Sequence, residues 1–416
     1  MSLLETLAAV LFATAVVHTF AARQFERLSL RFPRHEGLFH LLGEIEVVFG
    51  FWAMVLVLVF ALLKGPAPAI AYVESRQYTE PMFVFVIMVV AASRPVLVAL
   101  RSGVAALARA APVATPVASV WLSLAVVPLL GSLVTEPAAM TLAALLLAPQ
   151  VFRPGMPEWL KYAALGVLFV NVSIGGTLTS YAAPPVLMVA GTWEWNSAYM
   201  ASTFGWRSAL AVILNASAVT WLLRGHLAAL PQDAAADELP RVPLVVSAVH
   251  LAFLAAVVAV AHYPALFIGL FLFFLGFTQA YQRYQQPLLV KEALLVAFFL
   301  AGLVVLGGMQ EWWLQPLVSQ LPAGALFFGA LGLTAVTDNA ALTYLGSLIE
   351  GLSQEAKYSL VAGAVAGGGL TVIANAPNPA GVALLRKGFN DGSIGALGLL
   401  AGAAAPTLVA AIAFLI

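Results

Sequence analysis

The stretch "LVTEPAAM" at residues 133–140 has a counterpart in the second half of the chain, "AVTDNAAL" at residues 335–342. In register, Glu136 of the first stretch aligns with Asp338 of the second, and each acid follows a threonine. The sequence around both acids is almost entirely apolar. Because burying a charged group is costly unless it is paired, a chain that does so twice needs a reason for it.

The composition is that of an integral membrane protein. Of the 416 residues, 62% are hydrophobic and 9% are charged, and the mean hydropathy is +0.97. A soluble domain carries roughly 25% charged residues. A backbone in lipid must satisfy its own hydrogen bonds, so the apolar runs predict an all-α polytopic fold in the lipid bilayer. The net charge of zero gives no indication of a nucleic-acid partner, and the chain has no cysteine.

Matching motifs divide the chain into two similar halves. Two pairs of motifs accompany the acidic stretches in the same order: "LKYAAL" (160–165) with "AKYSLV" (356–361), and "GGTLTSYAAPP" (175–185) with "GGLTVIANAPNP" (368–379). A shared order indicates a single duplication. We therefore expect a first repeat over 1–226, a polar cytoplasmic linker over 227–241 and a second repeat over 242–416.

Each half is expected to contain a helix–tip–helix segment followed by a helix broken by Gly and Pro. The helix–tip–helix segments cover 115–152 and 322–351, and the broken helices cover 157–190 and 356–388. The other apolar runs predict spans at 4–22, 37–64, 82–101, 205–224, 242–262, 264–281, 286–308 and 394–416. A re-entrant hairpin enters and leaves on one side, so each half makes about five crossings and the second half is inverted. The expected fold is an inverted repeat of about 10 full spans and 2 hairpins.

The distribution of basic residues predicts which side of the membrane each connecting segment faces. With the N-terminus outside, most lysines and arginines, Lys161 among them, fall in cytoplasmic segments. The outer segments hold Lys64, Arg76, Arg207 and Lys357. This distribution follows the positive-inside rule, and moving the inversion by one span would scramble it. We therefore predict a multi-pass protein with both termini outside.

Glu136 and Asp338 are the first candidates for the functional site. Thr135 and Thr337 are good N-cap residues and acids suit the first turn of a helix, so capping explains part of the pattern. A cap does not need an acid, however, and acids inside membranes normally line a cavity or an ion path. Re-entrant tips bring half-helix N-termini and free carbonyls near the midplane, where an ion can bind. We favour this interpretation over capping alone.

The broken helices supply further oxygen ligands. Pro removes a backbone donor and leaves a carbonyl unpaired, which lipid tolerates only where the backbone is buried in protein or lines a wet cavity. Carbonyl, hydroxyl, amide and carboxylate oxygens suit a hard cation such as Na⁺. The alternative is a packing kink, but two such segments at matching positions favour a binding site. The candidate ligands besides the two acids are Thr135, Thr337, Asn339, Thr177, Thr179, Ser180, Thr371, Asn375 and Asn378.

Glu44, Glu46 and Arg94 form a second, less defined group. The two glutamates lie in the span 37–64 and have no acidic counterpart in the second half. They fit a proton path or a cluster at a dimer interface, and the pattern leaves a structural role open. Arg94 lies deep in its span and is expected to pair with one of these acids.

The motifs resemble those of known transporters. "GGTLTSYAAPPVLMVA" (175–190) resembles the Gly-Gly-Thr-x-Thr…Pro-Pro stretch of the ion transporter superfamily, which includes arsenite permeases, citrate–metal carriers, NhaD-type Na⁺/H⁺ antiporters and divalent anion/sodium symporters. "TEPMFVFVIMVVAASRP" (79–95), "LTAVTDNAALTYLGS" (333–347) and "GGGLTVIANAPNPAG" (367–381) resemble the bacterial putative Na⁺/H⁺ antiporter family. The resemblance covers essentially the whole chain.

This resemblance implies a homodimer in a bacterial inner membrane, each protomer having a scaffold part and a mobile transport part. It implies hairpin tips at Thr135–Pro137 and Thr337–Asn339, helix breaks at Thr177–Ala183 and Thr371–Asn378, and no cofactor besides the transported Na⁺ and H⁺. The dicarboxylate branch usually has Ser-Asn-Thr at the tips. The two acids here disfavour an anionic substrate, because their charges would repel it.

The leading interpretation is a secondary transporter that exchanges a monovalent cation, Na⁺, for H⁺. A carboxylate binds Na⁺ only when it is ionised and a proton only when the cation has left, which is the coupling that exchange requires. The alternative is a Na⁺-coupled symporter of a small anion or neutral solute, with the tip acids holding Na⁺. An intramembrane hydrolase is disfavoured, because His18, His40 and His250 lack metal-ligand spacing and the chain has no H-E-x-x-H motif.

Overall fold

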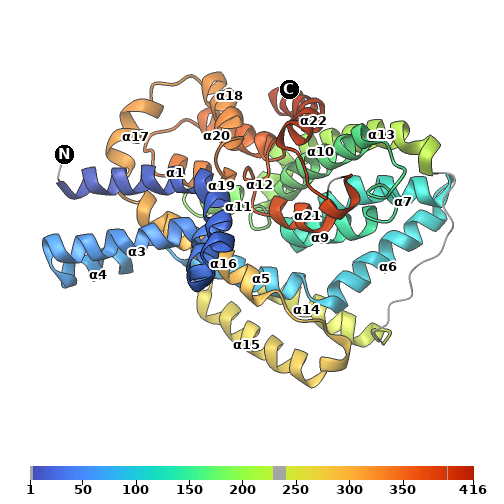
Figure 1. The fold of residues 1–416 in the computed structure, drawn as a ribbon, viewed down its shortest axis with the longest axis horizontal. Coiled ribbons are helices and arrows are strands. Elements are labelled where there is room, and N and C mark those ends of the chain that lie inside the picture. Colours follow the sequence, from blue (N-terminus) through green and yellow to red (C-terminus); the bar gives the residue numbers. More distant parts are fainter. Residues whose placement is uncertain (1–2, 228–239, 391) are drawn as a thin grey trace. The chain divides into compact units, whose positions relative to one another are not determined.

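The computed structural model describes residues 3–227, 240–390 and 392–416 (Figure 1). Within these ranges the elements are helices and turns, and no strand is present. The expected linker 227–241 lies almost wholly outside the described residues. The chain divides into two compact units: unit 1 holds the described residues of 1–85, 290–322 and 344–353, and unit 2 those of 86–289, 323–343 and 354–416.

The helices are those of a multi-pass membrane protein. Among the described residues, five helices are long and apolar enough to cross a membrane: Glu46–Lys64, Glu158–Leu178, Ser197–Leu227, Val290–Gly307 and Ala396–Leu415. Two bent pairs raise the number to seven if each is one span: Thr79–Ala91 with Arg94–Ala110, and Thr115–Leu124 with Val126–Val134. The all-α class is confirmed, whereas the inverted repeat of ten spans and two hairpins stays a prediction.

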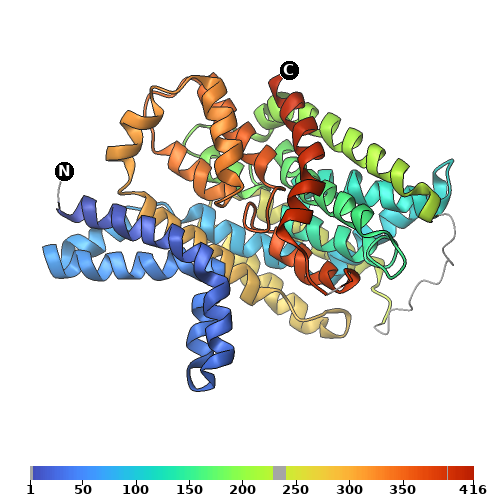
Figure 2. The same cartoon turned by 45° about the horizontal axis from the view of Figure 1, so that its top comes forward.

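Unit 1 combines helices from the start of the chain with helices from its second half. They are α1 (Leu3–Arg31), α2 (Glu36–Gly43), α3 (Ile45–Lys64), α4 (Pro66–Glu74), α16 (Val290–Gly307) and α17 (Glu311–Val318). α1 continues to Arg31, well beyond the expected span 4–22, and α2 folds back against it (Figure 2). The expected span 37–64 is divided at Glu44, whose backbone is extended (φ −76°, ψ 113°).

Unit 2 contains the helix–tip–helix segments and the broken helices. The first hairpin is α7 (Thr115–Leu124), α8 (Val126–Val134) and α9 (Glu136–Leu147), and the second is α18 (Ala323–Thr334) and α19 (Asn339–Ser347), whose last residues belong to unit 1. The first broken helix is α10 (Glu158–Gly175) and α11 (Pro184–Ala190), and the second is α20 (Gln354–Gly367) and α21 (Asn378–Leu385).

Further helices complete the fold. They are α5 (Thr79–Ala91), which begins in unit 1, α6 (Arg94–Ala110), α12 (Ser197–Met200), α13 (Trp206–Leu227), α14 (Leu244–Ala259), α15 (Pro264–Ala280) and α22 (Ala396–Leu415). Short 3₁₀ or π turns are η1 (Pro33–His35), η2 (Gly176–Leu178), η3 (Ala201–Gly205), η4 (Gln282–Tyr284) and η5 (Arg386–Gly388).

Proline determines several helix starts. Pro137 lies in the first turn of α9, and Pro184-Pro185 begins α11, because proline needs no backbone donor there. The expected span 82–101 is bent by 63° where α6 begins with Arg94-Pro95. The first hairpin has a second bend that the sequence analysis missed, 42° at Ala125.

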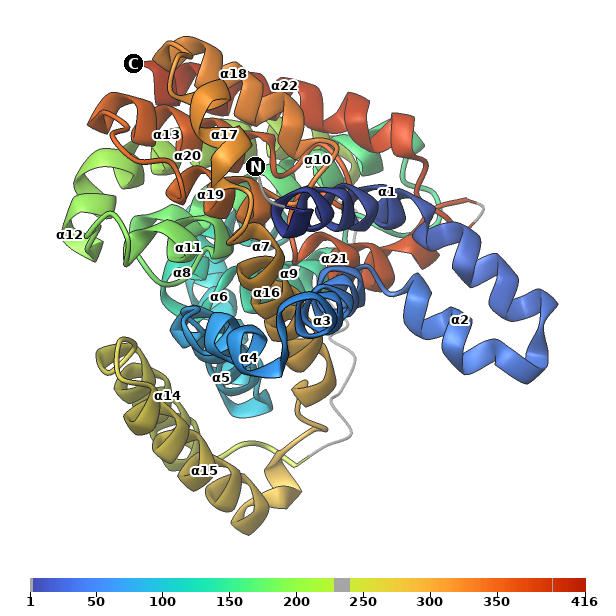
Figure 3. The same ribbon diagram turned by 90° about the vertical axis from the view of Figure 1, so that its left-hand side faces the viewer.

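α10 is the most buried of the candidate spans and packs against α8, α13, α20 and α22 (Figure 3). Its contact with α22 depends on small residues. A Cβ atom on Gly166 would overlap the main chain of Gly402, and a Cβ on Gly402 would overlap the carbonyl of Tyr162. Glycine at helix interfaces lets backbones approach closely where lipid supplies no hydrophobic driving force.

This contact predicts that Gly402→Ala lowers the thermal unfolding temperature of the purified protein. The added methyl group has to displace backbone, and overpacking of this kind costs about 1–3 kcal/mol. Gly332→Ala in α18 is the matched control, since no atom lies within 4 Å of a Cβ at Gly332. Alanine also has the higher helix propensity, so the control should be neutral or slightly stabilised. Equal unfolding temperatures for the two variants in detergent would contradict the close approach of α10 and α22.

Candidate functional site

Glu136 is the first residue of α9 and is completely buried, with 0% of its surface exposed. It follows Thr135, whose backbone has φ 83° and ψ 151°. A β-branched residue in this region of positive φ is strained by about 1–3 kcal/mol, and such strain gathers at functional sites. The turn at Thr135 places the Glu136 carboxylate at the N-terminus of α9, where backbone N–H groups favour negative charge.

Two other segments of unit 2 meet the Glu136 carboxylate. The Asn375 side-chain amide, from the break between α20 and α21, donates a hydrogen bond of 2.8 Å to Glu136 Oε2. Gly176, in the break after α10, lies so close that a Cβ there would be 2.6 Å from Glu136 Oε1. The start of α9 therefore lies against the break after α10 and the break between α20 and α21.

Several buried oxygens at this place have no hydrogen-bond partner among the described residues. They are Thr135 Oγ1, Glu136 Oε1 and Asn375 Oδ1. Buried polar atoms are normally paired, so each exception calls for an explanation. All three are able to accept, and a hydroxyl, a carboxylate and an amide oxygen are ligands that suit a hard cation. These oxygens are therefore of the kind that binds a hard cation such as Na⁺.

Asp338, the matching acid, is placed differently. It is half-buried, and its Oδ1 accepts hydrogen bonds from the backbone N–H groups of Ala340 (2.8 Å) and Ala341 (3.2 Å). This is N-cap geometry for α19. The two acids therefore differ in burial and in hydrogen bonding.

Asn339 and Asn378 connect the second hairpin and the second break. The Asn339 backbone N–H donates to the carbonyl of Ala374 (3.1 Å), and its side-chain amide approaches Ser173 Oγ in α10 (3.5 Å). The Asn378 amide donates to the carbonyls of Gly368 (2.8 Å) and Thr371 (2.9 Å). Both predicted residues are completely buried and stabilise the break around Glu136 and Asn375.

The other predicted hydroxyls hold the backbone of the breaks. Thr177 Oγ1 donates to the carbonyl of Ile174 (2.7 Å), and Thr179 Oγ1 to that of Ser132 (2.6 Å). Ser180 Oγ lies 3.2 Å from Ser197 Oγ, and Thr371 Oγ1 donates to the carbonyl of Ala335 (2.9 Å). Thr337 is half-buried beside Asp338. The hydrogen bonds of Thr177, Thr179 and Thr371 hold the backbone of the breaks and of the adjoining hairpin tips.

Several buried polar residues were missed from the sequence, Ser132 and Asn171 among them. Ser132 Oγ donates to the carbonyl of Gly175 (2.7 Å) and accepts from the N–H of Leu178 (2.9 Å), which joins the first hairpin to the first break. Asn171 donates to the carbonyl of Leu124 (2.8 Å), at the unexpected bend of the hairpin, and accepts from Asn215 (3.0 Å). The signal that could have found them is a polar side chain within otherwise apolar sequence.

The accessory group is divided between the units. Glu44 and Glu46 are half-buried in unit 1, at the junction of α2 and α3. Arg94 is in unit 2, 5% exposed, and donates to the backbone carbonyls of Pro240 (3.1 Å) and Tyr284 (3.2 Å). Pairing of Arg94 with one of the acids stays a prediction.

The site predicts that Gly176→Ala weakens cation binding without unfolding the protein. The new methyl group would be 2.6 Å from Glu136 Oε1, so the carboxylate has to leave its place. A ligand that binds only the folded state raises the unfolding temperature, and we expect Na⁺ to do so for the wild type. Gly176→Ala should lose this Na⁺-dependent shift. Gly225→Ala should keep it, because no atom lies within 4 Å of a Cβ at Gly225. An undiminished Na⁺ effect in Gly176→Ala would place the cation elsewhere.

Comparison with known proteins shows the family of the chain. No curated protein matches the chain. A family model described as "Putative Na+/H+ antiporter" matches residues 3–416. This is the family that the motifs at the second tip and second break resemble, and it is a class of transporter and not of enzyme. Because the match extends over essentially the whole chain, the protein belongs to the putative Na⁺/H⁺ antiporter family.

Proposed function

We propose that the protein exchanges Na⁺ for H⁺ across the membrane by alternating access, with Glu136 as the exchanging acid. The observation that carries this proposal is the completely buried carboxylate of Glu136, which has one oxygen held by Asn375 and the other without a hydrogen-bond partner among the described residues. A buried carboxylate of this kind is stable in two forms, protonated or ionised beside a cation.

Exchange follows from competition for one carboxylate. When Na⁺ binds, it compensates the charge of Glu136, and the unpaired oxygens of Thr135 and Asn375 complete part of its coordination. When Na⁺ leaves, a proton neutralises the same carboxylate, because an isolated charge at this depth is costly. The empty, ionised form is disfavoured, so the site crosses the membrane with either a cation or a proton.

Asp338 has a supporting role in this mechanism. It caps α19 and contributes a like charge near Glu136, which makes the doubly ionised pair without a cation unfavourable. The same negative charge attracts a cation toward the tips. Glu136 therefore exchanges the proton, and Asp338 contributes a nearby negative charge that favours a cation.

The inverted repeat supplies a route for alternating access. The two halves meet at the site, since Glu136 belongs to the first and Asn375 to the second. An inverted repeat allows one bundle to rock or slide against another around such a shared site. We further propose, from the resemblance and the distribution of basic residues, a homodimer in a bacterial inner membrane with both termini outside and membership of the ion transporter superfamily.

The alternative is a Na⁺-coupled symporter of a small anion or neutral solute. An anionic substrate is disfavoured by the two acids, and the hydrogen bonds shown for Arg94 go to backbone carbonyls. A hydrolase has less support. The His18 ring bonds Leu42 and Trp52, the His250 ring bonds Val246 and Gln285, and the described residues contain no group of three His, Cys, Asp or Glu side chains placed for a metal.

Purified protein in liposomes with an internal pH dye tests the proposal. Na⁺ added outside should drive H⁺ movement in wild-type vesicles, and the Na⁺ concentration for half-maximal exchange should fall as the pH rises, because fewer protons compete for the site. Glu136→Gln should reduce exchange to the level of protein-free liposomes. Asp338→Asn should retain exchange, since Asn caps a helix as well as Asp does.

Two outcomes would contradict this assignment. Normal pH-dependent exchange by Glu136→Gln would return Glu136 to a capping role and direct attention to Glu44 and Glu46. Movement of a labelled dicarboxylate or neutral solute that depends on Na⁺, without H⁺ counter-movement, would establish the symporter instead.

A further inference from the structure

Lys161 is a buried lysine outside the site described above. It lies in the first turn of α10, at the end of that helix remote from the break, and only 1% of its side chain is exposed. Its Nζ donates to the carbonyl of Gly388 (2.6 Å) and lies 3.3 Å from Glu158 Oε2. Lysine is almost never fully buried unless it is paired, so this placement calls for a specific reason.

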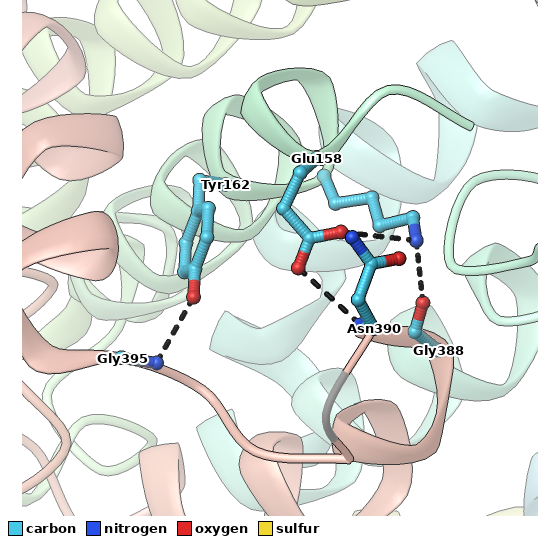
Figure 4. Close-up of polar contacts among 6 residues, drawn as sticks. Glu158, Tyr162, Gly388, Asn390 and Gly395 are labelled. Carbon is cyan, nitrogen blue, oxygen red and sulfur yellow. Dashed lines mark hydrogen bonds and ion pairs between the residues drawn. The ribbon is translucent and has the colours of Figure 1, made fainter. Parts of the chain in front are cut away.

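The residues around Lys161 fasten the segment between α21 and α22 to α10. Glu158 Oε1 accepts from the backbone N–H of Asn390 (3.4 Å), and the Tyr162 hydroxyl accepts from that of Gly395 (3.0 Å) (Figure 4). Lys161 Nζ also lies 5.9 Å from the centre of the Phe389 ring. We call Glu158, Lys161 and Tyr162 the α10 clamp. Its partners are two backbone N–H groups, a carbonyl and an aromatic ring on one short segment.

Two helices, α21 and α10, lead from the α10 clamp to the candidate site. α21 is eight residues long, which is about 12 Å, and it runs from Asn378, beside Asn375, to the segment held by the clamp. α10 runs from the clamp to Gly176, beside the carboxylate of Glu136. α21 also packs against α9, the helix that Glu136 begins. The clamp at one end and the Asn375–Glu136 hydrogen bond at the other therefore hold α21 in one position along α10.

The matching lysine shows a related contact in the other half. Lys357, in the first turn of α20, lies 5.5 Å from the centre of the Trp193 ring, in the segment that follows α11. Each broken helix thus begins with a lysine over an aromatic residue that follows the other broken helix. Lys357 is only half-buried, whereas Lys161 is almost inaccessible. The lysine with more polar contacts is therefore Lys161, which holds the segment after α21, the helix that follows Asn375.

We propose that Lys161 is a positioning residue for the cation site: it keeps α21 in register with α10, so that Asn375 stays on the carboxylate of Glu136. An ammonium group suits this task because it has three donors and binds a carbonyl and a carboxylate at once. This proposal rests on the proposed exchange function, in which Asn375 and Glu136 bind the cation. It assigns the clamp to a permanent connection and not to a gate that opens in each cycle.

The first test is the Lys161→Met variant, which keeps a long unbranched side chain and removes the charge. In liposomes we expect the Na⁺ concentration for half-maximal exchange to rise by about tenfold, as loss of a charge-assisted hydrogen bond would cause, with little change in the maximal rate. Lys387→Met is the control, because Lys387 is exposed and adjacent to Gly388 and loses the same charge. Wild-type vesicles without any Na⁺/H⁺ exchange would overturn the proposed function. Exchange by the wild type with unchanged Na⁺ dependence in Lys161→Met would overturn the role of Lys161 alone.

A second test separates positioning from loss of stability. The chain has no cysteine, so thiols introduced as Glu158→Cys and Asn390→Cys in the Lys161→Met protein are unique. A short, reducible bifunctional thiol reagent joining them replaces the clamp by a covalent link. We expect the crosslink to restore the Na⁺ dependence to that of the wild type, and reduction to remove the rescue. A crosslink that stops exchange would show that the clamp opens as a gate, and a crosslink without effect would show that the defect is not one of position. Either result would overturn the proposal.

Discussion

The hydrogen bond between Asn375 and Glu136 is the interaction on which the candidate site depends. It joins residues 239 positions apart and gives a completely buried carboxylate one fixed partner. The other carboxylate oxygen is left for a cation or a proton. A fully satisfied carboxylate would have no reason to bind either, and an isolated one would be too costly to bury. The exchange proposed for this site therefore depends on a carboxylate that is only partly hydrogen-bonded.

Close backbone contacts make that hydrogen bond possible. Gly176 leaves room for the Glu136 carboxylate, and Gly166 and Gly402 let α10 and α22 approach. Gly367 and Gly368, in the second broken helix, lie against Leu331 of α18 and Ser173 of α10 in the same way. In lipid, small residues and interhelical hydrogen bonds have to supply the association that the hydrophobic effect supplies in water. The glycine-rich sequence before each break thus packs the helices that surround the site.

The two acids occupy matching positions in similar motifs but have different surroundings. Both follow a threonine at a hairpin tip, but Asp338 accepts two hydrogen bonds from its own helix, whereas Glu136 has a longer side chain and reaches Asn375. A shared charge pattern therefore does not imply equal ligands. The same holds for the lysines, since Lys161 is buried in a set of polar contacts and Lys357 is half-buried over a tryptophan.

The sequence by itself determined the membrane class, the all-α fold, the two acidic tips and the two breaks, because hydropathy, proline and glycine act locally. Asn375, Asn339 and Asn378 were also predicted from the sequence as site residues, since amides are conspicuous in apolar sequence. Only the tertiary structure showed that Glu136 and not Asp338 is completely buried, and that Lys161, counted from the sequence as a cytoplasmic charge, is enclosed by α10 and the segment after α21. Ser132 and Asn171 were missed for the same reason. Burial and pairing are set by segments far apart in the chain, and no local pattern records which of them will meet.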